Sequence, residues 1–80
     1  MKGVVFTTLN DLVEDRFGLA TWDELLERSG SSGVYTSAGT YPDQELFTLV
    51  GGLSELLQVD ADKLVRTFGE FMFNKLAAHY

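Results

Sequence analysis

The stretch from Asp60 to Tyr80 constrains this chain most, because it reads as one long amphipathic helix. Its apolar residues recur at the i, i+3, i+4 spacing of a single helical face. They are Leu64, Val65, Phe68, Phe71, Met72 and Leu76, with Phe73 at the edge. A stripe so rich in large side chains must be buried, so the preceding residues have to supply the surface that covers it.

Three shorter helices and one loop are expected before that stretch. Apolar residues at helical spacing indicate the helices, and a run of Ser, Gly and Thr indicates the loop. These three helices are expected at residues 3–17, 21–29 and 42–58, and the loop at residues 30–41. The long last helix is expected at residues 60–79. The sequence therefore predicts a single all-α domain over residues 1–80.

Helix ends are marked by specific residue types. Gly18 suits the end of the first helix, and Thr21 with Glu24 forms a capping-box pattern for the second. Pro42 suits the first turn of the third helix, and Asp60 suits the N-cap of the last. The pair Gly51–Gly52 interrupts the third helix; a close helix crossing or a local kink would each explain it.

Composition excludes several classes of function. The 80 residues carry a net charge of −6, which disfavours nucleic acid and anionic membrane surfaces as partners. The absence of cysteine excludes disulfides and thiolate chemistry and leans weakly towards the cytoplasm. No apolar run reaches the roughly 18 residues of a membrane span.

Residues that could carry chemistry are few. The single histidine, His79, stands beside the last residue, where solvent exposure is expected and no metal-ligand spacing accompanies it. The carboxylate pair Asp11 and Asp15 lies on a polar helix face, where solvation explains it. No grouping of nucleophile, base and stabiliser is visible, so an enzyme is not predicted. The residues alone indicate an acidic, all-helical binding domain.

A series of short motifs runs along the whole chain. They are Met1–Phe6, Leu9–Val13, Trp22–Leu26, Val34–Ser37, Tyr41–Phe47, Phe68–Phe71 and Phe73–Asn74. In this order the motifs resemble the haem nitric-oxide/oxygen-binding family, the H-NOX domains. The resemblance covers all 80 residues with almost no gaps, although each motif by itself is weak.

The resemblance implies the four-helix N-terminal, or distal, subdomain of a larger domain that is α+β when complete. In the family a later helix provides the proximal histidine, and a Tyr-x-Ser-x-Arg motif holds the haem propionates. Residues 1–80 contain neither, and His79 comes too early to be that histidine. The chain is therefore expected to be a truncated domain that binds haem weakly or not at all by itself.

The resemblance also implies a haem-facing wall with no metal ligand of its own. In the family the first and fourth helices form the distal wall, which points here to Val5, Leu9, Met72 and Leu76. All four are apolar, and the family binds oxygen where a hydrogen-bond donor is present. The parent domain is thus expected to sense nitric oxide and discriminate against oxygen. Leu64, Val65 and Phe71 are expected to pack against the other helices.

Expected partners also follow from the resemblance. The parent domain would regulate a signalling protein such as a histidine kinase or a cyclic-di-GMP enzyme. Without the proximal half, a stripe at Val5, Leu9, Phe68, Met72 and Leu76 is expected to be exposed and to drive formation of a homo-oligomer. The alternative from another class is a helical protein-interaction module that needs no cofactor.

Overall fold

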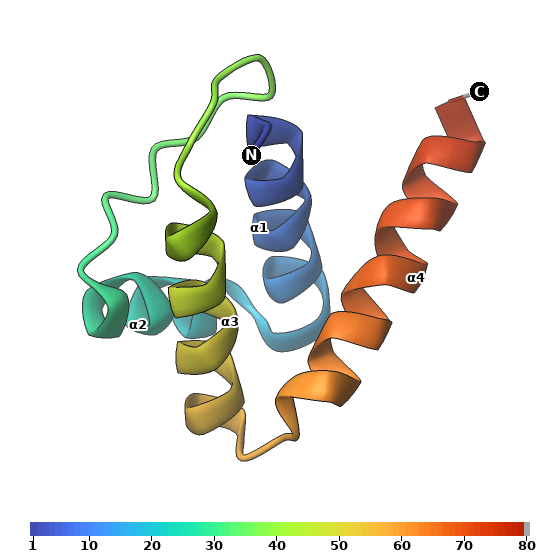
Figure 1. Ribbon diagram of the computed structural model, residues 1–80. Coiled ribbons are helices and arrows are strands. Elements are labelled where there is room, and N and C mark those ends of the chain that lie inside the picture. Colours follow the sequence, from blue (N-terminus) through green and yellow to red (C-terminus); the bar gives the residue numbers. More distant parts are fainter. Residues whose placement is uncertain (80) are drawn as a thin grey trace.

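The computed structural model describes residues 1–79, and the side chains of residues 1–78. It contains four helices: α1 (Gly3–Phe17), α2 (Leu19–Ser29), α3 (Asp43–Leu57) and α4 (Ala61–His79) (Figure 1). The described residues form no strand, and their one β-bridge is an isolated pairing of Lys2 with Thr40. The predicted all-α class is confirmed.

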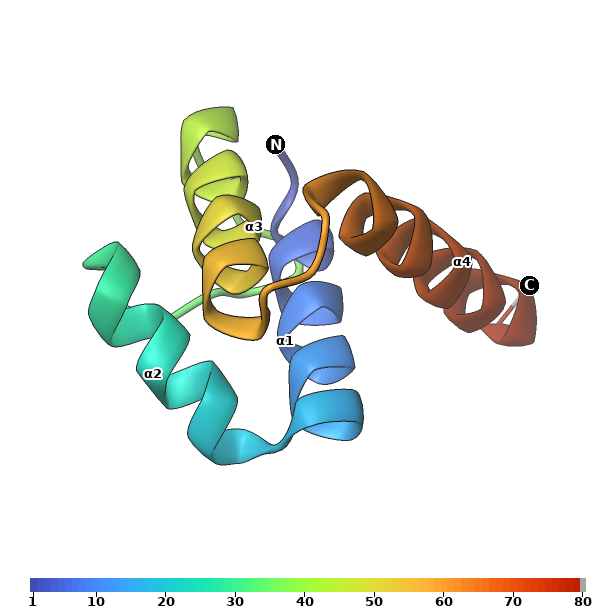
Figure 2. The same ribbon diagram turned by 90° about the horizontal axis from the view of Figure 1, so that it is seen from below.

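One hydrophobic core holds the four helices together. Seen from below, α1, α2 and α3 lie close together while α4 extends away to one side (Figure 2). Among the described side chains, most of the buried core residues belong to α1, α2 and α3, and only Leu64 comes from α4. The core consists of Phe6, Leu9, Val13, Trp22, Leu25, Leu46, Leu49, Leu53 and Leu64. Burial of this apolar surface is the main source of stability in so small a chain.

The start of the second helix differs from the sequence-based expectation. Gly18 has φ +94°, so the chain turns directly from α1 into α2, which begins at Leu19 instead of residue 21. The predicted capping box is wrong, because Thr21 lies inside α2 and the N-cap position is occupied by Gly18, which has no side chain. The Thr21 hydroxyl instead donates to the Phe17 carbonyl oxygen at 2.9 Å.

The starts of α3 and α4 lie near the expected positions. Pro42 is the N-cap of α3 rather than its first residue, with an extended backbone at φ −61° and ψ 139°. Asp60 precedes α4, and its carboxylate accepts a hydrogen bond from the Asp62 backbone amide at 3.0 Å. This is the N-cap geometry predicted for Asp60.

The helix α3 runs unbroken through Gly51–Gly52, which decides between the two explanations of that pair. A Cβ atom at Gly52 would approach Leu25 of α2 at 3.0 Å, so this glycine permits a close helix crossing. Gly51 faces open space, because a Cβ atom at that position would have no neighbouring atom within 4 Å. Only one of the two glycines is therefore required by packing.

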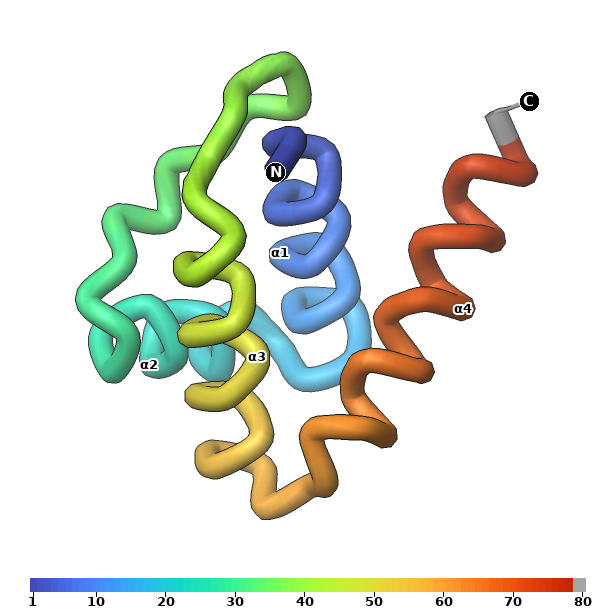
Figure 3. The backbone as a smooth tube through the Cα atoms, viewed as in Figure 1, coloured from blue at the N-terminus to red at the C-terminus, as the bar shows by residue number. Residues whose placement is uncertain are grey.

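The loop between α2 and α3 is fastened to the first turn of α1. Figure 3 shows it passing over the N-terminal end of that helix. The Gly3 amide donates to the Gly39 carbonyl, and the Tyr41 amide donates to the Met1 carbonyl, both at 2.8 Å. The Phe6 ring stacks on Tyr35 with ring centroids 4.7 Å apart and meets Tyr41 edge-on at 5.2 Å. These contacts fix the end of α1 that carries Val5.

Tyr35 also ties the loop to α3 by hydrogen bonds. Its hydroxyl donates to the Glu45 Oε1 atom at 2.8 Å and lies 2.5 Å from the Ser31 hydroxyl. Burial, with the neighbouring Glu45 carboxylate adding to it, raises the pKa of the Tyr35 hydroxyl above its ordinary value of 10.0.

This raised pKa predicts an alkaline loss of stability. Since the folded state holds the Tyr35 proton more tightly than the unfolded state, the stabilisation is complete below the ordinary pKa and falls as pH rises through the raised one. Urea unfolding between about pH 9 and 12 should give a steeper decline for the wild type than for Tyr35→Phe. Equal slopes for the two proteins would contradict the assignment.

Candidate functional site

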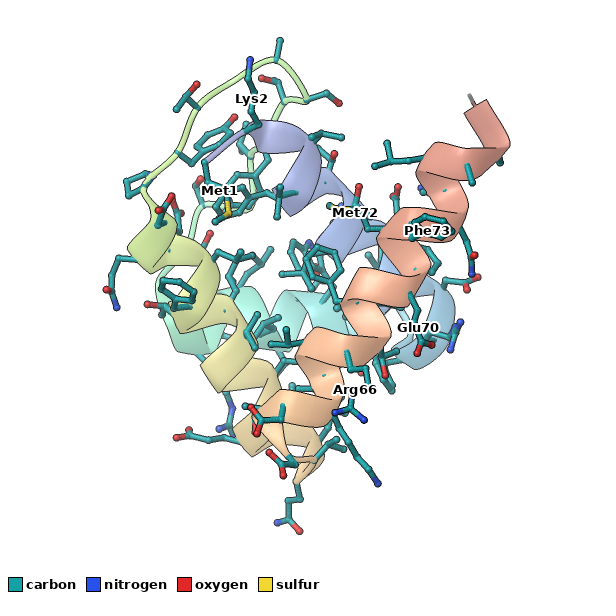
Figure 4. The ribbon with its side chains drawn as sticks, turned by 45° about the vertical axis from the view of Figure 1, so that its right-hand side comes forward. Met1, Lys2, Arg66, Glu70, Met72 and Phe73 are labelled. Atoms are coloured by element: carbon teal, nitrogen blue, oxygen red, sulfur yellow. The ribbon has the colours of Figure 1, made fainter. Side chains whose placement is uncertain are left out.

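The four predicted wall residues lie on the adjacent helices α1 and α4 but differ in exposure. Leu9 belongs to the core at 1% exposure, and Val5 is half-buried against that core. Met72 is half-buried and Leu76 is 45% exposed. In Figure 4, Met72 lies on the α1 side of α4, whereas Phe73, Glu70 and Arg66 lie along its outer side. Met72 and Leu76 on α4 therefore offer more exposed surface than Val5 and Leu9 on α1.

Two expectations for the apolar stripe are wrong. Leu9 is not exposed, because Phe68 and other apolar side chains pack on the core to which Leu9 belongs. Val65 does not pack into the helix bundle but is 56% exposed. Leu64, by contrast, is buried at 7% as expected. The reason is the orientation of α4. Its Leu64 and Phe68 side chains face the core, and Val65 beside them is left exposed.

An apolar groove lies between α3 and α4, with a volume of about 480 Å³. Phe68 and Met72 contribute to it from α4, and the exposed Phe47 contributes from α3. Its lining is completed by Leu46, Val50, Gly51, Ala61, Val65 and Gly69. Of the four predicted wall residues, Met72 is the one that contributes to the lining of this groove.

Sequence reasoning missed the contribution of α3 to this surface. The signal that pointed to it was the width of the α3 apolar face, which is larger than one neighbouring helix can cover. Phe47 at 61% exposure is the part left uncovered. Gly69 of α4 also faces this groove, with no atom within 4 Å of an added Cβ, so no close helix contact explains it within the described residues.

The helix α4 also has a polar contact with α1. The Lys75 ammonium forms an ion pair with Asp11 Oδ2 and lies 5.6 Å from the centroid of the Phe71 ring. Glu14 and Asp15 line the same open cavity, of about 510 Å³. Within the described residues, no three His, Cys, Asp or Glu side chains are grouped as a metal ion would require. The expectation for His79 concerns a side chain outside the described part.

The described helices include none with the length and hydropathy needed to cross a bilayer. The apolar groove between α3 and α4 is thus a partly uncovered surface of a helical domain, with Phe47 and Val65 exposed beside it.

The sequence matches a family described as haem-NO-binding over residues 2–80. The soluble guanylate cyclase gcy-32 of Caenorhabditis elegans is 32% identical over 74 residues, which are 90% of this chain and 11% of that protein. This chain therefore corresponds to a small part of that relative.

Solved H-NOX structures share the fold over the whole chain. The Fe(II) unliganded H-NOX protein of K. algicida is 41% identical with a TM-score of 0.93, over 100% of this chain and 44% of that one. The H-NOX of Shewanella woodyi in the Fe(II)CO state is 48% identical with a TM-score of 0.86, over 100% and 43%. The Fe(II)NO form from S. oneidensis is 39% identical with a TM-score of 0.85, over 99% and 44%. The chain thus spans under half the length of these relatives.

Proposed function

Because the chain belongs to the haem-NO-binding family, a family of haem-based gas sensors, we propose that it forms the distal side of the haem pocket in a nitric-oxide sensor domain. The haem-facing residues of this proposal are Val5 and Leu9 on α1 and Met72 and Leu76 on α4. The observation that carries it is the apolar surface at Met72 and Leu76, which the chain itself leaves partly uncovered.

The side chains present suit one side of a haem and not the other. Gas-sensing haem proteins hold the iron through an axial side chain such as histidine, and residues 1–78 contain neither histidine nor cysteine. Aliphatic and thioether side chains suit the face of a porphyrin, where they exclude water. We therefore assign to this chain the gas-binding side, with the axial histidine supplied by the remainder of the domain.

The four residues would act by selecting the gas. When bound, haem supplies the ferrous iron to which nitric oxide binds. Bound oxygen gains stability from a hydrogen-bond donor beside it, and none of the four side chains can donate. Leu9 and Val5 are held by the core, so the α1 side of the wall is rigid, while Met72 and Leu76 on α4 are less enclosed. A wall of this kind favours nitric oxide over oxygen.

We further propose that the complete domain is a sensor rather than a catalyst and regulates a signalling protein. The similar protein from Caenorhabditis elegans is named a guanylate cyclase, of which the matching part is only 11%. This proportion supports a regulatory domain joined to a larger output unit. A histidine kinase or a cyclic-di-GMP enzyme is the partner class that the family resemblance suggests for this chain.

A hybrid domain tests the proposed pocket. Residues 1–80 would replace the aligned part of the K. algicida H-NOX, and haem uptake and the Soret band would be followed by absorption spectroscopy. The expected result is a ferrous haem whose Soret band shifts with nitric oxide and forms no stable oxygen complex in air. Met72→Gln introduces a donor and should raise oxygen affinity about 2- to 10-fold, the worth of one net hydrogen bond.

Met72→Leu is the matched control, because it changes the same position without adding a donor. A hybrid that folds but takes up no haem would favour the cofactor-free interaction module instead. A stable oxygen complex in the unmodified hybrid would contradict the proposed selectivity for nitric oxide.

A further inference from the structure

The second half of α4 has little support from the hydrophobic core. Leu64 near the start of the helix is buried, Phe68 and Phe71 are half-buried, and Phe73 is 71% exposed. From Leu76 to Ala78 the described side chains are exposed. The two perpendicular views of Figures 1 and 2 agree that α4 diverges from α1 towards its C-terminal end. Apolar packing therefore fixes the beginning of α4 but not the direction of its end.

One polar contact does reach this half of the helix. Among the residues whose side chains are described, Lys75–Asp11 is the single ion pair between α4 and another helix. Among the same residues, it is also the single hydrogen bond between side chains of α4 and of another helix. The Lys75 ammonium in addition lies over the Phe71 ring at 5.6 Å, a distance at which a cation is attracted to the ring face.

The position of this contact matters for the neighbouring residues. Lys75 follows Met72 by three residues and directly precedes Leu76, so any rotation of α4 about its beginning moves all three together. Asp11 lies in the middle of α1, which the core holds through Phe6, Leu9 and Val13. The pair thus connects a helix fixed by the core to the least supported part of α4.

We infer that the Asp11–Lys75 pair is a latch that sets the angle between α1 and α4, with Asp11 and Lys75 as positioning residues for Met72 and Leu76. The latch is a property of this chain and needs no cofactor. Its consequence for a haem wall rests on the proposed function, since moving α4 then changes the space beside the bound gas.

The exposure of the pair indicates how strong the latch is. The side chains of Lys75 and Asp11 are 43% and 50% exposed, so water and salt screen their attraction. Exposed pairs of this kind shift a two-state equilibrium by about 1.5- to 5-fold. The latch therefore biases the angle of α4 without locking it, and a change of local charge is enough to release it.

Distances between spin labels test the latch directly in this chain. The sequence has no cysteine, so Val4→Cys on α1 and Ala78→Cys on α4 provide two unique and exposed labelling sites. Pulsed electron paramagnetic resonance measures the distribution of distances between the two labels. The ratio of short to long distances should fall by about 1.5- to 5-fold in Asp11→Asn and in Lys75→Gln. The charge swap Asp11→Lys with Lys75→Asp should restore it.

The control is Glu14→Gln, which removes the same charge from the same cavity while leaving the ion pair intact. Salt of about 1 M should reproduce the effect of Asp11→Asn in the wild type and add nothing in the variant. Unchanged distances in both single variants, with helix content preserved by circular dichroism, would overturn the latch. Because these measurements involve no haem, they are independent of whether the hybrid domain binds one.

Discussion

Phe6→Ala is expected to lower the free energy of unfolding by about 3–5 kcal/mol, the usual loss for a buried aromatic side chain. Phe6 is fully buried and contacts two other rings, Tyr35 at 4.7 Å and Tyr41 at 5.2 Å between centroids. These two tyrosines fasten the α2–α3 loop to α1, so the loss is felt beyond the cavity itself. Small domains have only about 5–15 kcal/mol in total, so this loss removes a large fraction of the free energy of unfolding.

Urea unfolding followed by circular dichroism at 25 °C measures the change. Phe73→Ala is the matched control, because it removes the same side chain from a position that is 71% exposed. The control should change the free energy of unfolding by no more than about 0.5 kcal/mol. Similar losses for the two variants would mean that the Phe6 ring does not organise the core.

Gly3→Ala is expected to destabilise the chain by about 3 kcal/mol, at the upper end for an overpacked site. A Cβ atom at Gly3 would lie 1.6 Å from the Thr36 carbonyl oxygen, which is backbone and cannot rotate away. The loop would have to move, and the hydrogen bond from the Gly3 amide to the Gly39 carbonyl would be lost. Thermal unfolding should show a midpoint lowered by at least about 10 °C.

Gly51→Ala is the control for that prediction. It makes the same substitution inside α3, where nothing lies within 4 Å of the new methyl group. Alanine favours the helix by roughly 1 kcal/mol over glycine, so this variant should be slightly more stable than the wild type. If Gly3→Ala also left the midpoint unchanged, the close approach of the loop to α1 would be refuted.

Much of the local structure could be read from residue types. Asp60 was identified as the N-cap of α4 because its carboxylate suits the free amides of a first helical turn, and the contact with Asp62 bears this out. The capping box at Thr21 is wrong because the positive φ of Gly18 turns the chain directly into α2, so that Thr21 lies inside the helix and not before it.

The candidate site was predicted less completely. The family resemblance led to Val5, Leu9, Met72 and Leu76, and these stay predictions for contact with haem. Helical periodicity alone could not distinguish Leu9, buried at 1%, from Leu76, exposed at 45%, because both occupy apolar positions of amphipathic helices. The exposure of a side chain depends on how far its part of the helix lies from the core. That distance cannot be read from the spacing of residues along one helix.

The sequence by itself determined the all-α class, the family and the apolar face of α4, because these depend on residue type and on spacing within one segment. Only the tertiary structure decided that α4 diverges from α1, that Val65 and Phe47 stay exposed beside a groove, and that Lys75 meets Asp11. The physical reason is that the angle between two helices depends on side chains far apart in the chain. Residues 11 and 75 become neighbours only after folding.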